Sequence, residues 1–197
     1  CLEIINLAHR KEIDCIIFPE LTLTGFSFED DHLFENIKNS SILKVFEKQS
    51  NLKNINVIFG SLIKENTKKY NAFCISKPRE KSKVIYKKIN TFNHSGEDLF
   101  ITKGREIKTF KVKGINFLPA ICFDLRFPIH FLALAKSCDA SICIANWPKI
   151  RISHWHTLLK ARAIENQMYM IGVNRIGKDG KGIEYIESSI IYDPLGN

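Results

Sequence analysis

Short apolar runs alternate with longer amphipathic stretches along the whole chain. Residues 15–18 (CIIF) form a typical run, followed directly by Pro19. Short apolar runs bounded by turn residues are typical of strands, whereas apolar residues that recur every three or four positions predict helices. We predict strands over residues 15–18, 57–62, 72–76, 84–86, 109–112, 117–122, 141–145, 170–174 and 189–192. We predict helices over residues 2–10, 42–49, 128–136 and 154–167.

This alternation indicates a single α/β domain over residues 1–197. No repeat and no linker divides the chain. The hairpin-like spacing of the strands between residues 57 and 86 favours a mixed sheet over a purely parallel one. The third helix is expected to begin at Pro128, because proline suits the first position of a helix.

Composition and charge exclude several classes of protein. Hydrophobic residues make up 45% of the chain and charged residues 25%, which is ordinary for a globular domain. No apolar stretch approaches the roughly 18 residues that span a bilayer, so we expect no membrane partner. The net charge of +8 could suggest a nucleic-acid partner, but the lysines are scattered and no stripe of spaced aromatic residues accompanies them. We therefore expect a solvated basic surface and no nucleic-acid partner.

The six cysteines show no C-x-x-C spacing, so neither a zinc site nor a redox pair is predicted. Cys15, Cys74 and Cys143 lie in strand-like runs and are expected to pack as small hydrophobic residues. A free thiol that must stay reduced fits a cytoplasmic setting. We predict no metal and no cofactor.

Cys122 differs from these cysteines because it stands where an apolar strand ends and polar chain begins. The sequence FDLRFP follows at residues 123–128. Ligands of open α/β sheets bind at the carboxyl ends of strands, so this position makes Cys122 a candidate nucleophile. A thiol buried only for packing is the alternative.

Two charged residues also follow predicted strands. Glu20 comes after Pro19, which ends the strand because it cannot donate to a sheet ladder. Lys87 and Lys88 follow another strand, and because adjacent side chains point to opposite faces, at most one of them can face inward. Taken alone, each charge also fits a solvent-facing position.

A carboxylate, an ammonium and a thiol form a suitable set for amide hydrolysis. The carboxylate would take the thiol proton, because the thiolate is the effective nucleophile. The ammonium and the backbone N–H after the cysteine would stabilise the oxyanion, and losing one such donor typically costs about 3 kcal/mol of barrier. Spacing alone does not show that these residues meet.

Three segments, 18–26 (FPELTLTGF), 86–92 (YKKINTF) and 121–128 (ICFDLRFP), resemble in this order the signature segments of the nitrilase (carbon–nitrogen hydrolase) superfamily. The similarity runs through essentially the whole chain. The resemblance implies an αββα sandwich with mixed sheets, which dimerises through its helices.

Carried over by position, the resemblance implies roles for individual residues. Glu20 would be the general base, Lys88 the oxyanion-stabilising lysine and Cys122 the nucleophile. Glu97 matches a second glutamate of the family that helps to position the substrate and the lysine.

Four further segments, 145–148 (ANWP), 154–156 (HWH), 161–167 (ARAIENQ) and 173–180 (VNRIGKDG), look most like the ω-amidase branch. Members of that branch hydrolyse the terminal amide of 2-oxoglutaramate or 2-oxosuccinamate to the dicarboxylate and ammonia. The expected partners are a small-molecule amide and a second copy of the chain. An amidase or N-carbamoyl hydrolase with another substrate is the alternative within the superfamily. A non-catalytic member or an inactive fragment is the alternative outside catalysis.

Besides Glu97, four residues near these motifs are candidates for positioning the substrate: Phe123, Arg126, Asn146 and Trp147. Arg126 could hold a substrate carboxylate through two hydrogen bonds or could brace its own loop. Trp147 could form a wall of the pocket or belong to the core.

Other polar residues are assigned to the architecture. His154 and His156 are two positions apart and would point in different directions on a helix, so they make a poor metal pair. Arg162 and Glu165 are three apart and are expected to pair.

The chain departs from the family pattern at two positions and at both ends. Phe123 stands where a tyrosine is usual, and Asn90 stands where related sequences often have histidine. The family has a strand before the first helix and another strand after the final DPLGN segment. We expect an incomplete domain with unpaired sheet edges, which are an aggregation hazard.

Overall fold

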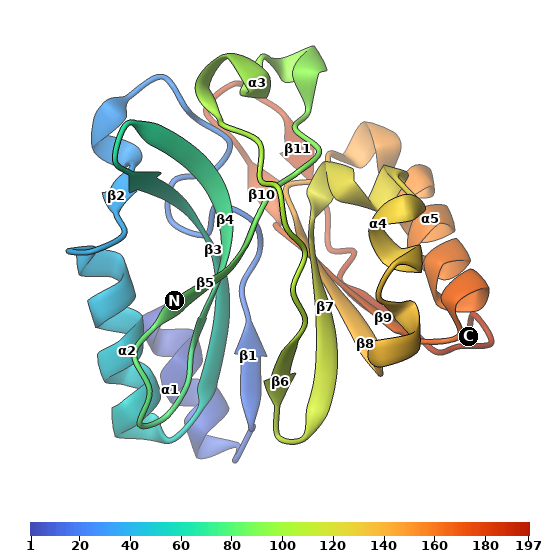
Figure 1. Cartoon of the computed structure of the whole chain (residues 1–197), viewed down its shortest axis with the longest axis horizontal. Coiled ribbons are helices and arrows are strands. Elements are labelled where there is room, and N and C mark those ends of the chain that lie inside the picture. Colours follow the sequence, from blue (N-terminus) through green and yellow to red (C-terminus); the bar gives the residue numbers. More distant parts are fainter.

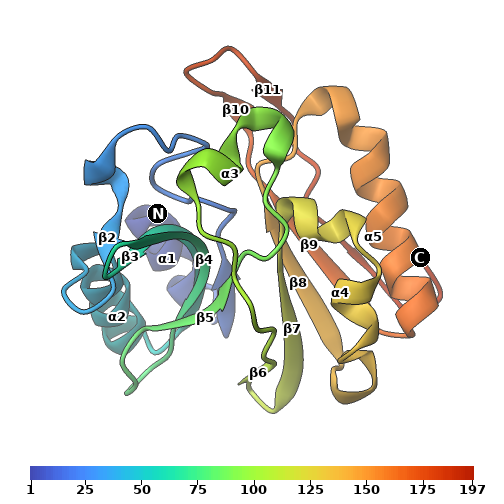
Figure 2. The ribbon, with the colours of Figure 1, turned by 45° about the horizontal axis from the view of Figure 1, so that its top comes forward.

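The computed structural model describes residues 1–197 and stacks two β-sheets between two layers of helices (Figure 1). Helices α1 (Leu2–Arg10) and α2 (Ser41–Lys53) cover the outer face of one sheet. Helices α4 (Ile129–Leu132) and α5 (Ile152–Asn166) cover the other sheet. The four layers keep this order in the turned view of Figure 2. The expected αββα sandwich is confirmed.

The first sheet is mixed, as predicted. Its order is β1 (Cys15–Ile17), β3 (Asn56–Glu65), β4 (Lys68–Ser76) and β5 (Lys83–Lys87), and the short β2 (Glu35–Asn36) also pairs with β3. Strand β1 runs parallel to β3, whereas β3, β4 and β5 form an antiparallel meander. The hairpins of this meander have the spacing that the sequence shows between residues 57 and 86.

The second sheet has a parallel centre with antiparallel edges. Its order is β12 (Ile190–Tyr192), β9 (Tyr169–Asn174), β8 (Ala140–Ala145), β7 (Ile115–Ile121) and β6 (Phe110–Val112). Strands β7, β8 and β9 are parallel, and β8 is buried along its whole length. Strands covered on both faces have continuous apolar sequences of this kind. A separate hairpin, β10 (Gly177–Lys178) and β11 (Glu184–Tyr185), belongs to neither sheet.

The largest core lies between the two sheets and beneath α4 and α5. Along β3, Ile58 joins this core, whereas Val57 and Phe59 point to the opposite face and pack under α1 and α2. Because successive side chains of a strand point to opposite faces, one apolar run serves both cores. This arrangement fixes the register of the sheets and the positions at which their strands end.

Several predicted elements differ from the observed ones in their bounds, and two of these differences have a clear structural reason. The helix predicted over 128–136 is wrong beyond Leu132, because Leu134 (φ −123°, ψ 0°) leaves the helical conformation and only a short 3-10 turn, Ala135–Ser137, follows. The chain must reverse over these residues to enter β8. The strand predicted to reach Cys122 ends at Ile121, because Cys122 opens a 3-10 turn, Cys122–Arg126.

Some elements were not predicted. They are β2, β10, β11 and the short helix α3 (Glu97–Phe100). None of the helices has the combination of length and apolar sequence that crossing a bilayer requires.

Candidate active site

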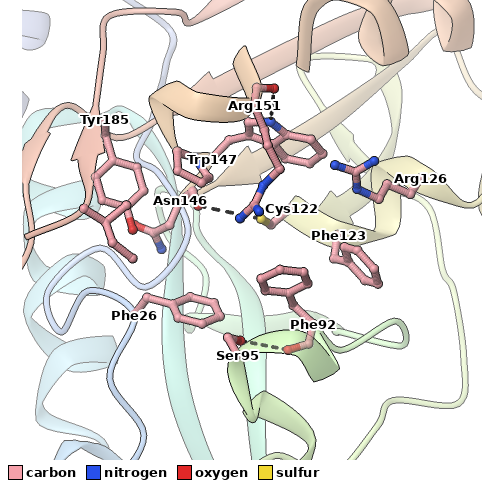
Figure 3. A pocket seen from close by; sticks show the side chains of 12 residues that line it. Phe26, Phe92, Ser95, Cys122, Phe123, Arg126, Asn146, Trp147, Arg151 and Tyr185 are labelled. Carbon is pink, nitrogen blue, oxygen red and sulfur yellow. Dashed lines mark hydrogen bonds between the residues drawn. The ribbon is translucent and has the colours of Figure 1, made fainter. Parts of the chain in front are cut away.

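The turns that follow β1, β5 and β7 meet at one end of the sandwich. They bring Glu20, Lys88 and Cys122 together. Cys122 also lines a pocket formed by residues of both halves of the chain (Figure 3). The structure therefore gathers residues that are far apart in the sequence. Each of them is placed by a different local feature.

Glu20 is held by a close approach between two backbones. Gly60 of β3 passes so near that a Cβ atom there would lie 2.4 Å from the nitrogen of Leu21 and 2.7 Å from the Cα of Glu20. Only glycine permits such an approach. The Glu20 carboxylate is 1% exposed, and its Oε2 accepts a hydrogen bond of 2.8 Å from the backbone N–H of Asn146. This bond ties the first sheet to the end of β8 in the second.

Lys88 is fully buried between two carboxylates. Its Nζ lies 3.0 Å from Oε1 of Glu20 and 2.9 Å from Oε2 of Glu97. Burial alone would lower the pKa of Lys88, but the negative charges of Glu20 and Glu97 outweigh it and hold the pKa well above its ordinary value. Lys88 is therefore an ammonium. Its neighbour Lys87 points the other way, over the ring of Tyr70, as the alternation of strand side chains predicts.

Asn71 of β4 connects the two carboxylates. Its Nδ2 donates to Oε1 of Glu20 at 2.8 Å and to Oε1 of Glu97 at 3.0 Å. The bonds fix the orientation of the amide, because the Oδ1 face would repel both carboxylates. Sequence reasoning missed Asn71, since a single asparagine near the start of a strand is no signal of a site.

Cys122 has a backbone conformation that is unusual for its residue type. Its φ is 47°, in the left-handed region, which typically costs about 1–3 kcal/mol and is often found at active sites. Sγ lies 4.0 Å from the backbone oxygen of Asn146. Burial raises the pKa of the Cys122 thiol well above its usual value, and the negative charge of Glu20 adds to this, against the opposing charge of Lys88. The resting thiol is therefore protonated.

A buried carboxylate, Asp124, fixes the turn that carries the cysteine. Its Oδ2 accepts from the Tyr86 hydroxyl at 2.8 Å and from the backbone N–H of Ile121 at 3.0 Å. Its Oδ1 accepts from the backbone and the side chain of Asn90 at 3.0 and 2.9 Å. The asparagine that departs from the family pattern thus has a defined role, because it bonds the cysteine turn to the end of β5.

The wall of the pocket is largely aromatic, and two guanidinium groups face into it. The aromatic residues are Phe26, Phe92, Phe123, Trp147 and Tyr185. The guanidinium of Arg126 lies 5.0 Å from the centre of the Trp147 ring, and that of Arg151 lies 5.3 Å from the centre of the Phe92 ring. Figure 3 shows both groups near Cys122. The site thus combines a thiol, an apolar wall and positive charge.

The residues predicted to position the substrate lie among the buried charges around Lys88, in the wall of the pocket, or in both places. Glu97 is buried and contacts Lys88, and Phe123, Arg126 and Trp147 line the pocket itself. Asn146 does both, because it is buried against Glu20 and also lines the pocket. Both alternatives for Trp147 hold, because it also belongs to the largest core.

Arg126 lines the pocket and also contacts α5. Its Nη2 lies 3.2 Å from Nδ1 of His154, which braces the side chain, and the guanidinium still faces the pocket. Arg151 was missed, although it lies only a few residues beyond the ANWP segment. Tyr185 was missed because the hairpin that carries it has no strong strand pattern.

Arg162 pairs with Glu165 at 2.8 Å, as predicted. Its Nε and Nη2 also donate to the backbone oxygen of Leu125, so α5 supports the cysteine turn. No group of three or more His, Cys, Asp or Glu side chains is arranged to hold a metal ion.

The chain has clear relatives among known proteins. The family model for carbon-nitrogen hydrolases matches residues 1–197. The omega-amidase YafV of Yersinia enterocolitica is 34% identical over 187 residues, which cover 94% of this chain and 71% of that protein. A 2-oxoglutaramate amidase of Bacillus subtilis (strain 168) is 29% identical over 94% of this chain and 72% of its own length.

A solved structure agrees with this relationship. A CN-hydrolase superfamily protein from Xanthomonas campestris, which has an arsenic adduct in its active site, superposes with a TM-score of 0.88 at 27% identity. The match covers 99% of this chain and 77% of that one. The resemblance noted in the three sequence segments is thereby confirmed, and the chain belongs to the carbon–nitrogen hydrolase family.

Proposed function

We propose that this protein is a cysteine-dependent amidohydrolase that cleaves the terminal amide of a small ω-amido carboxylic acid of the 2-oxoglutaramate or 2-oxosuccinamate type. The observation that supports it most strongly is the buried contact of Lys88 with Glu20 and Glu97 beside the thiol of Cys122. The names of relatives, omega-amidase and 2-oxoglutaramate amidase, support the substrate class.

Acylation begins when Glu20 takes the thiol proton of Cys122 and the sulfur attacks the amide carbon. The carbonyl oxygen becomes an oxyanion, which the Lys88 ammonium and the backbone N–H of Phe123 stabilise. Glu20 returns the proton to the amide nitrogen, the C–N bond breaks and ammonia leaves. The acyl group remains on Cys122 as a thioester.

Deacylation repeats these steps with water. Glu20 takes a proton from water, the hydroxide oxygen attacks the thioester carbon, and the same donors hold the second oxyanion. The C–S bond breaks, Cys122 regains its proton and the carboxylic acid is released. The two carboxylates around Lys88 serve both acylation and deacylation. Glu97 helps to keep the lysine charged and in place, and Glu20 transfers protons.

The remainder of the pocket suits the rest of such a substrate. The aromatic wall would contact the methylene groups, and the guanidinium of Arg126, which lines the pocket, would bind the carboxylate at the far end. Trp147 and Phe123 flank this arginine, and Asn146 holds the general base through its backbone N–H.

The proposal extends to the setting of the enzyme. We propose that residues 1–197 act as one domain, in a homodimer and in a reducing cytoplasm. All six cysteines are free, which fits a reducing compartment. Exposed apolar residues on α4 and α5, namely Ile129, Leu132 and Ile164, fit burial between two copies.

The test is ammonia release from 2-oxoglutaramate, measured beside the Cys122→Ala variant, with circular dichroism to show that both proteins are folded. We expect turnover by the wild type and none by the variant. Turnover of an N-carbamoyl amine but not of 2-oxoglutaramate would move the enzyme to another substrate class. A folded wild type that releases ammonia from no amide would contradict the proposal.

A further inference from the structure

We propose that Arg151 is a specificity-determining residue, which forms with Arg126 a two-guanidinium clamp for the 2-oxo carboxylate end of the substrate. The inference deepens the proposed function and rests on it for the reaction, although binding can be tested separately. It assigns a ligand role to Arg151, which no sequence motif had singled out.

The first observation is that two positive charges face one pocket without a counter-ion. Neither Arg126 nor Arg151 has a carboxylate within 4.0 Å, whereas the neighbouring Lys149 pairs with Glu184 at 3.1 Å and Arg162 pairs with Glu165. Two unpaired cations close to each other repel, and a bound anion would remove that repulsion. The two unpaired guanidinium groups therefore favour the binding of an anionic ligand.

The second observation is that the two groups are oriented by their surroundings. Arg126 contacts His154 and lies over the ring of Trp147, and Arg151 lies over the ring of Phe92. The turn that carries Arg151 is fixed as well, since its backbone oxygen accepts a hydrogen bond of 2.8 Å from Nε1 of Trp147. Both side chains are half-buried, so ion pairs made here are screened less than on an open surface.

The chemistry of a 2-oxo acid matches two guanidinium groups better than one. A carboxylate with an adjacent carbonyl presents three oxygen atoms at one end of the molecule. One guanidinium can donate hydrogen bonds to both carboxylate oxygens, and the second can donate to the 2-oxo oxygen and to one carboxylate oxygen. A simple amide offers neither group, and a saturated ω-amido acid offers only the carboxylate. The clamp thus selects 2-oxo ω-amides.

The first test compares Arg151→Gln with Lys149→Gln, which removes the same charge from the same turn but outside the pocket. We expect Arg151→Gln to lower kcat/KM for 2-oxoglutaramate about 100-fold, mainly through KM, because two charge-assisted hydrogen bonds are lost. The kcat/KM of Lys149→Gln for 2-oxoglutaramate should stay within about 2-fold of the wild-type value, because an exposed ion pair usually contributes little. Arg151→Lys should recover only part of the loss, because lysine lacks the fork.

Two further substrates separate recognition from structural damage. Pentanamide has neither charge nor 2-oxo group, so Arg151→Gln should lower its kcat/KM far less than that of 2-oxoglutaramate. Glutaramate keeps the carboxylate but lacks the 2-oxo oxygen. Arg151→Gln should therefore lower kcat/KM for glutaramate less than for 2-oxoglutaramate. An equal loss for all three amides, or no loss for 2-oxoglutaramate, would overturn the clamp.

Calorimetry with the Cys122→Ala background tests the clamp without turnover. We expect this protein to bind 2-oxoglutaramate, and the added Arg151→Gln change to raise Kd about 100-fold. Failure of the Cys122→Ala protein to bind 2-oxoglutaramate would overturn the inference. Selective binding with no ammonia release by the wild type would instead contradict the proposed reaction and leave the clamp standing.

Discussion

Three charged side chains meet at the base of the pocket with almost no exposure to solvent. A buried charge is costly unless it is paired and hydrogen-bonded, and here Glu20 and Glu97 share the one ammonium of Lys88. Asn71 supplies a further donor to each carboxylate. Removing Lys88 would leave two buried carboxylates without a positive partner, and removing either carboxylate would leave Lys88 with only one, so the individual residues of this group depend on one another.

Glu20→Gln should have opposite effects on turnover and on the reactivity of the thiol. Turnover should fall at least about 100-fold, because the general base is lost. After burial, the negative charge of Glu20 is the main cause that raises the pKa of Cys122, whereas Lys88 lowers it. Removing the Glu20 charge should therefore lower the pKa of Cys122. The pH midpoint of Cys122 alkylation should therefore move to lower pH in the variant.

Iodoacetamide labelling, followed by peptide mass spectrometry over a range of pH, measures this midpoint. Cys138, which lies away from the pocket, is the reference within each sample. Retained turnover in Glu20→Gln, together with an unchanged midpoint, would show that Glu20 does not act on Cys122.

At the scale of elements, the site depends on how closely β3 passes beneath the turn after β1. Gly60 leaves no room for a side chain, since a Cβ would meet backbone atoms of Glu20 and Leu21. The backbone cannot yield as a flexible side chain would. The position of the general base is thus set by a glycine in a neighbouring strand.

Gly60→Ala should destabilise the protein by about 1–3 kcal/mol, because the added methyl group forces the two backbones apart. It should also lower kcat by displacing the Glu20 carboxylate. Urea denaturation and ammonia release measure the two effects. Gly180→Ala is the matched control, since no atom lies within 4 Å of a Cβ there and its φ is not positive. Equal stability and activity of both variants would contradict the close approach.

Most strands could be predicted from the sequence because their apolar runs serve two buried faces, and most helices because their apolar residues recur every three or four positions. The helix over residues 2–10 has its predicted bounds, and the strands differ by a few residues at their ends. The helix predicted over 128–136 is wrong beyond Leu132, since its pattern cannot show that the chain must turn into β8. The hairpin of β10 and β11 was missed because its strands are two residues long and only partly buried.

The site was predictable only where a residue follows a recognisable strand. Glu20, Lys88 and Cys122 each stand at such a boundary, and the structure brings them together. Asn71 and Asp124 gave no signal, because the role of a buried polar group in a strand or turn is defined by contacts with other elements. Their importance depends on tertiary packing.

At the scale of the whole molecule, buried thiols lie in both halves of the sandwich. Cys74 packs in the core under α1 and α2, whereas Cys122 and Cys143 belong to the core between the sheets. Burial raises the pKa of each of these three thiols, and the charge of Glu20 contributes further at Cys122, where Lys88 opposes it. The folded chain therefore keeps protons that the unfolded chain loses above its ordinary thiol pKa of about 8.5.

The free energy of unfolding should fall as the pH rises above about 8.5, because the folded state then binds more protons than the unfolded state. The loss is about 1 kcal/mol for each buried thiol between pH 8.5 and 9.5. Urea denaturation under reducing conditions at both pH values measures it. Burial also raises the pKa of Cys15, to about 12, so Cys74→Ala should reduce this pH dependence by about one quarter. An unchanged dependence in that variant would exclude Cys74 as a contributor.

The most direct test of the account is the detection of an acyl group on Cys122 during turnover. Wild-type protein is mixed with 2-oxoglutaramate, quenched in acid within milliseconds and digested for peptide mass spectrometry. The account predicts a thioester on the peptide that contains Cys122, and none on peptides with the other five cysteines. Ammonia release by a folded Cys122→Ala variant, or turnover without any acylated Cys122, would contradict it.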